Sequence, residues 1–66
     1  MHTNLYRITI VGRLGAMDRE IFAGFDVMPD GRAIVLVGEL DQAALYGVLD
    51  RIQALGLELV EIARLS

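Results

Sequence analysis

The sequence contains no cysteine, no lysine and no tryptophan, and it has a single histidine, His2. Without cysteine the chain forms no disulfide, and one histidine does not make a structural metal site. A chain of 66 residues buries only about 60% of the surface that its unfolded form exposes, so it needs stabilisation from another source. Because association with further copies is the source that remains, we expect a homo-oligomer, a dimer or larger.

Positive charge is also scarce, since six arginines face nine acidic residues and the net charge is −3. This balance repels phosphate backbones and anionic lipid, so we expect neither nucleic acid nor membrane as a partner. No apolar run reaches the ~18 residues of a membrane span, and the N-terminus lacks the basic start of a signal peptide. We therefore expect a cytoplasmic protein. Hydrophobic residues nevertheless make up 55% of the chain, which predicts an apolar surface that a partner covers.

The first expected element is a strand over residues 5–13, with residues 1–4 frayed. Tyr6, Ile8 and Ile10 lie on one face of this strand. The other face carries Arg7 and Thr9 but also Val11, so neither face is cleanly polar. This pattern is typical of a central strand or of a sheet that is covered on both sides.

Residues 14–25 allow two interpretations. Met17, Ile21 and Phe25 recur every four positions, which favours a short helix bracketed by Gly15 and Gly24. A hairpin leading into a strand over 21–28 is the alternative. The Pro-Asp-Gly sequence at 29–31 then predicts a tight turn, and the apolar run at 33–37 predicts a strand in mid-sheet.

The helix over residues 42–55 has clear boundary signals. Asp41 is the expected N-cap, Leu40 and Leu45 form a hydrophobic staple, and Gly56 is expected at C′ of a Schellman end. The helical spacing predicts one stripe that faces the sheet: Leu45, Val48, Leu49, Ile52 and Leu55.

The last expected strand covers residues 57–65, and its charges indicate an edge position or the rim of an interface. Glu58 and Glu61 are three apart, so we expect their side chains on opposite faces. Together the elements predict one α+β domain over residues 1–66, with a four-stranded, mainly antiparallel sheet and one main helix on one face. This is a ferredoxin-like arrangement with a stunted first helix; a β-meander followed by a crossover helix and a fourth strand is the alternative.

Groups that carry catalysis are few. The only serine is Ser66, and no cluster of residues suggests catalysis, a cofactor or a metal ion. We expect no enzyme, although a compact enzyme that uses Tyr46, arginine and carboxylates stays open. A second hypothesis is a regulatory module that binds a small molecule at a subunit interface, and its candidate contacts lie near strand ends or the helix start: Gly12, Arg13, Asp26, Asp41 and Gln42.

The outer face of the helix is a candidate interface. Steps of 100° place a mostly small and uncharged set of residues opposite the apolar stripe: Ala43, Gly47, Asp50 and Ala54. Tyr46 lies on the flank of the helix. Gly47 costs about 1 kcal/mol relative to alanine within a helix, but small residues four apart allow a second backbone to approach closely. We predict that this face contacts another copy, although small residues are also tolerated on an exposed helix.

Four stretches of this sequence resemble a group of small stand-alone bacterial proteins of unassigned function. They are YRITIVGRL, FAGFDVM, VLVGEL and DQAALYGVLDRIQALGLELVEI, and the last is the most specific. The resemblance implies a stand-alone module and brings no activity, cofactor or catalytic residue. We therefore expect a homo-oligomeric interaction or scaffold protein.

Overall fold

The computed structural model describes residues 2–13 and 22–66. Residues 14–21, most of the segment expected to be a short helix or a hairpin, lie outside the described residues. Phe22 to Phe25 form a turn in which the Phe25 N–H donates to the Phe22 carbonyl (3.1 Å). In chain order the elements are β1 (Asn4–Val11), β2 (Asp26–Asp30), β3 (Ala33–Leu40), α1 (Gln42–Ala54) and β4 (Glu58–Arg64).

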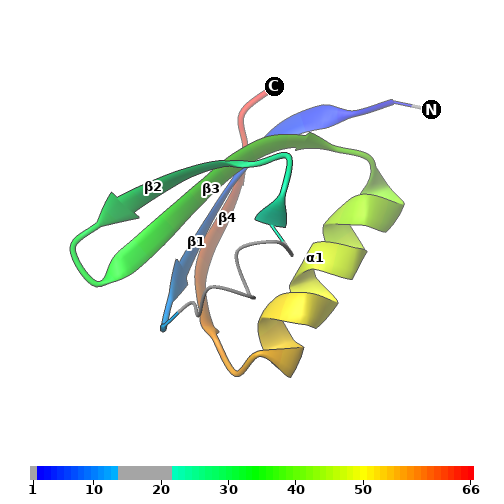
Figure 1. Ribbon diagram of the computed structural model, residues 1–66. Helices are drawn as coiled ribbons and strands as arrows, with labels where there is room; N and C mark the ends of the chain where they lie inside the picture. Colours follow the sequence, from blue (N-terminus) through cyan, green and yellow to red (C-terminus); the bar gives the residue numbers. More distant parts are fainter. Residues whose placement is uncertain (1, 14–21) are drawn as a thin grey trace.

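The four strands form one sheet in the order β2-β3-β1-β4, and every neighbouring pair is antiparallel. The α+β prediction is confirmed, and this strand order is compatible with a ferredoxin-like fold. The meander alternative is wrong because β3 separates β1 from β2. Helix α1 lies on one face of the sheet (Figure 1). As the sequence indicated, β1 is central and β4 is an edge strand.

The core lies between α1 and the face of the sheet that carries Ile8, Ile10 and Leu36, whose side chains are fully buried. Phe22 closes this core at 2% exposure, and its ring meets that of Phe25 edge to face at 6.3 Å between centroids. The predicted stripe of α1 does face the core, but it is buried less evenly than expected. Val48 and Ile52 are buried, whereas the three leucines of the stripe are only half-buried against the core.

Both ends of α1 follow the local sequence signals. A side-chain oxygen of Asp41 accepts a hydrogen bond from the Ala44 N–H (2.7 Å), as expected of an N-cap. At the other end Gly56 has a φ of +71°, and the N–H of Leu57 donates to the Ile52 carbonyl (3.1 Å). This bond and that from Gly56 N–H to the Gln53 carbonyl form the Schellman motif. The helix ends at Ala54, one residue before the predicted boundary.

The hairpin between β2 and β3 turns one residue later than predicted. Asp30 pairs with Ala33, so Pro29 lies inside β2 and the loop consists of Gly31 and Arg32. Gly31 has a φ of +63° and Arg32 has no positive φ, which fits a type II′ turn. Proline is tolerated in β2 because this strand is at the edge of the sheet.

Candidate functional site

The five candidate ligand contacts do not form one site. Asp26 pairs with Val37 near the end of β3, and Asp41 and Gln42 follow that same end. Gly12 and Arg13 follow β1, which runs in the opposite direction, so they lie at the other end of the sheet. Along the strand direction Asp41 lies roughly 25 Å from Gly12, and Asp26, which is level with Arg7, lies roughly 17 Å from it. A single small molecule therefore cannot contact both.

Gly12 has a structural role that its sequence context did not reveal. Its φ is +149°, and a β-carbon at this position would collide with the side chain of Leu57. Leu57 is buried in the core and lies three residues after the end of α1. Glycine at position 12 therefore allows the end of β1 to pack closely against the connection between α1 and β4.

Asp41 and Gln42 already have partners within α1. The Asp41 carboxylate caps the helix, and the Gln42 side-chain amide donates to the Tyr46 hydroxyl at 3.2 Å. Tyr46, on the flank of the helix, is 57% exposed. The other three candidate interface residues lie on the outside of α1. Ala43 and Ala54 are exposed, and among the described residues a β-carbon on Gly47 would meet no atom outside its own helix turn within 4 Å.

The side of the sheet opposite α1 is named here the open face. Side chains that pair directly across antiparallel strands share a face, so the strand registers define its members. Along β1 and β3 these side chains are mostly half-buried, whereas those facing α1 include the fully buried residues of the core. The open face consists of Leu5, Arg7, Thr9 and Val11 of β1, Asp26, Met28 and Asp30 of β2, Ala33, Val35, Val37 and Glu39 of β3, and Glu58, Glu61 and Ala63 of β4.

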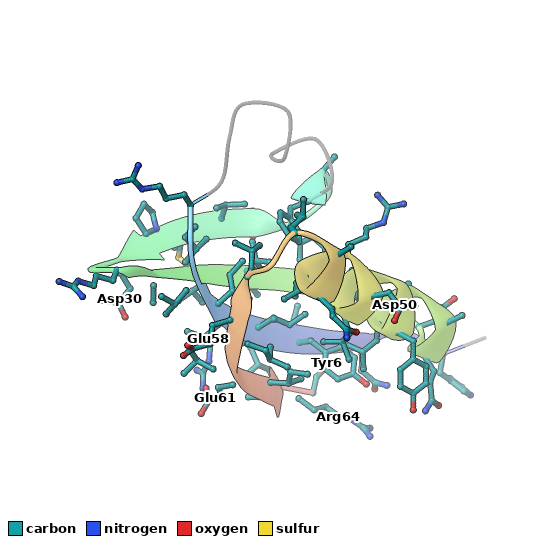
Figure 2. All side chains as sticks on the ribbon, turned by 90° about the horizontal axis from the view of Figure 1, so that it is seen from below. Tyr6, Asp30, Asp50, Glu58, Glu61 and Arg64 are labelled. Atoms are coloured by element: carbon teal, nitrogen blue, oxygen red, sulfur yellow. The ribbon has the colours of Figure 1, made fainter. Side chains whose placement is uncertain are left out.

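Glu58 and Glu61 share the open face, so the prediction of opposite faces is wrong. The register between β1 and β4 shifts at Thr9, which pairs with Glu61, while Ile10 pairs with Leu59. Val60 is the extra residue of this β-bulge. Because one additional residue inverts the alternation of side chains, Glu58 lies on the same face as Glu61. Figure 2 shows both carboxylates projecting to the same side of β4.

Glu61 accepts a hydrogen bond from the Arg7 guanidinium of the neighbouring strand at 3.1 Å. Within residues 2–13 and 22–66 this is the one ion pair. Its side chains are 43% and 54% exposed, so water screens the attraction and its contribution to stability is small. The pair occupies the single arginine of the open face.

Exposed apolar side chains gather on β4. Seven large hydrophobic residues of the described chain are at least 37% exposed, and four of them lie between positions 59 and 65. β4 is an edge strand, paired on one side with β1. The sequence analysis predicted an edge strand or the rim of an interface for residues 57–65. The signal for that prediction was the mixture of apolar and charged residues along this stretch. The four residues are Leu59, Val60, Ile62 and Leu65.

In the described part of the chain, no group of three or more His, Cys, Asp or Glu side chains is placed to hold a metal ion. Nor does any helix of those residues have the length and apolar character needed to cross a membrane.

Comparison with known proteins returns a family but no function. Neither the curated proteins nor the solved structures include a significant match to this sequence. One family model, described as a domain of unknown function (DUF8691), matches residues 5–63, which is nearly the whole chain. The protein therefore belongs to the DUF8691 family of domains of unknown function.

Proposed function

We propose that this protein is a homo-oligomeric interaction module that pairs with a second copy of itself along β4. The observation that carries the proposal is the exposure of Leu59, Val60 and Ile62 on a strand at the edge of the sheet. An edge strand presents unpaired N–H and C=O groups, and a second strand can bind them with main-chain hydrogen bonds. Burial of the apolar side chains adds to the stability of that pairing.

The two edges of the sheet differ in how well they resist such pairing. β2 is five residues long, contains Pro29 and carries Asp26 and Asp30 at its ends, which are features that protect an edge. β4 has seven residues, and the stretch from Glu61 to Arg64 follows its bulge with regular pairing to β1. The later half of β4 is thus the better template for another strand.

Symmetry favours one register for this pairing. In a twofold dimer the contact is isologous, and an antiparallel pair centred on Glu61 would set two like charges against each other. Centring the pair on Ile62 instead sets Ile62 against its own copy, Glu61 against Ala63 and Val60 against Arg64. This register keeps Glu61 and Ala63 on the open face in both copies.

The test is the mass of the protein in solution, measured by light scattering or sedimentation from about 1 to 200 µM, the range of moderate affinities. We expect the mass to rise above the 7.3 kDa of one chain toward twice that value. A mass of one chain at every concentration would contradict the proposal.

A matched pair of variants locates the contact. Val60 is 55% exposed on β4, and Val27 is 48% exposed on β2, at the opposite edge. Val60→Lys would set the new ammonium against Arg64 of the second copy, so we expect the dimer to dissociate. Val27→Lys makes the same change of size and charge, and we expect it to dimerise like the unaltered protein.

The outer face of α1 is the competing surface for self-association. We expect Gly47→Leu to leave the mass unchanged if β4 forms the contact. If Gly47→Leu gives a monomer while Val60→Lys does not, the contact lies on α1, as the helical spacing of Ala43, Gly47 and Ala54 suggests, and the β4 proposal is wrong.

A further inference from the structure

The open face has an apolar centre and acidic borders. On this face its two central strands, β3 and β1, carry mainly apolar side chains, including Val35, Val37 and Val11, and the two charged exceptions are Arg7 and Glu39. The outer strands carry carboxylates, with Asp26 and Asp30 on β2 and two glutamates on β4. Met28, 48% exposed, lies between the two aspartates. A partner that covers this face would meet an apolar strip with negative charge along both sides.

Most of the acidic side chains among residues 2–13 and 22–66 lie on this face. The open face has five carboxylates and one arginine, so its formal charge is −4. The whole chain carries −3, and all the other residues together therefore carry +1. The single arginine, Arg7, already binds Glu61, which leaves the remaining carboxylates to attract cations from outside.

We propose that the open face binds an amphipathic helix of another protein, with an apolar stripe bordered by lysine or arginine. The dimensions fit this occupant. The outer strands of a four-stranded sheet are about 14 Å apart, and a helix is about 10–12 Å across, so a helix along β1 and β3 brings its flanking cations to both borders. The strands have five to eight residues, and a helix of about 11–18 residues has the same length.

The charge of the open face favours a basic amphipathic helix over other possible partners. A second copy would bring another face of charge −4 against the first, and nucleic acid or anionic lipid would likewise bring negative charge. This interaction uses a different surface from the β4 edge, so it stands apart from the proposed self-association and does not depend on it.

The probe is a synthetic peptide of about 16 residues, built from leucine, alanine and lysine so that a leucine stripe is bordered by lysine on a helix. A second peptide replaces each lysine with glutamate. Binding is followed by isothermal titration and by amide chemical shifts of the labelled protein. We expect the lysine peptide to bind, the glutamate peptide to fail, and the shifts to fall on open-face residues of β1 and β3.

Two variants of equal charge test the borders. Asp30→Asn with Glu58→Gln removes one carboxylate from each border, whereas Asp41→Asn with Asp50→Asn removes two carboxylates that lie off the open face. Because exposed ion pairs contribute modestly, we expect the first variant to weaken binding about fivefold and the second to change it less than about twofold. Equal weakening in both variants, binding of the glutamate peptide, no binding of the lysine peptide or shifts confined to α1 would overturn the proposal.

Discussion

Replacing Gly12 with alanine tests the packing at the junction of β1, α1 and β4. The residue has a φ of +149°, which a side chain rarely permits, and a β-carbon would collide with Leu57. Leu57 is buried, and its backbone N–H also closes the C-terminal end of α1. The substitution therefore strains the backbone and overpacks the core at the same position.

The expected cost follows from these two effects. Strained backbone at such a φ costs about 1–3 kcal/mol, and one extra methyl group in a packed core costs about 1–3 kcal/mol. Together they predict a loss of about 2–6 kcal/mol in the free energy of unfolding. A domain of this size has only about 3–10 kcal/mol to lose, so the variant should be severely destabilised.

Urea and thermal unfolding measure this loss. Both are carried out at one fixed protein concentration, because association of the protein shifts the urea midpoint and the melting temperature. Gly24→Ala is the control for backbone strain, because Gly24 has a φ of +93° and a β-carbon there meets no atom of residues 2–13 and 22–66 within 4 Å. Shortening the neighbour, as Leu57→Val, should relieve part of the collision. We expect the double variant to lose at least about 1 kcal/mol less than the sum of the two single losses.

Two results would refute this reasoning. If Gly12→Ala costs no more than Gly24→Ala, the collision with Leu57 contributes nothing. If the losses of Gly12→Ala and Leu57→Val simply add, the two residues are not coupled.

Further changes test other contacts. Asp41→Ala removes the N-cap and should lower the free energy of unfolding by about 1 kcal/mol in a urea titration, whereas Asp41→Asn should keep most of it. Glu61→Gln breaks the half-exposed pair with Arg7 and should cost under about 1 kcal/mol, so a larger loss would contradict the screening argument. Phe22→Ala should cost about 3–5 kcal/mol because the ring is 2% exposed, and Phe22→Leu should cost less. Gly47→Ala should raise the melting temperature, with a gain of about 1 kcal/mol, because its methyl group meets no atom within 4 Å.

The candidate site could be predicted only in part from the sequence. The outward direction of Gly47 followed from helical spacing, and the structure places that residue as expected. The ligand hypothesis grouped Gly12 with Asp41 because both follow strands. The ligand hypothesis did not take into account the direction in which each strand runs. Because β1 and β3 pair antiparallel, Gly12 and Asp41 lie at opposite ends of the sheet.

The sequence by itself determined the elements whose hydrogen bonds close within a few residues. The cap at Asp41, the Schellman end at Gly56 and the hairpin after Asp30 depend on side chains and φ angles within about six residues of each other. Their boundaries were predicted to within one or two residues.

Only the tertiary structure decided which strands are neighbours and which side chains share a face. Glu58 and Glu61 lie together because the register shift at Thr9 inserts Val60 into β4, and that shift depends on a strand about 50 residues earlier in the chain. The acidic borders of the open face arise in the same way, from the placement of β2 and β4 at the two edges. Local spacing cannot reveal such a surface, because it is assembled from residues that are distant in sequence.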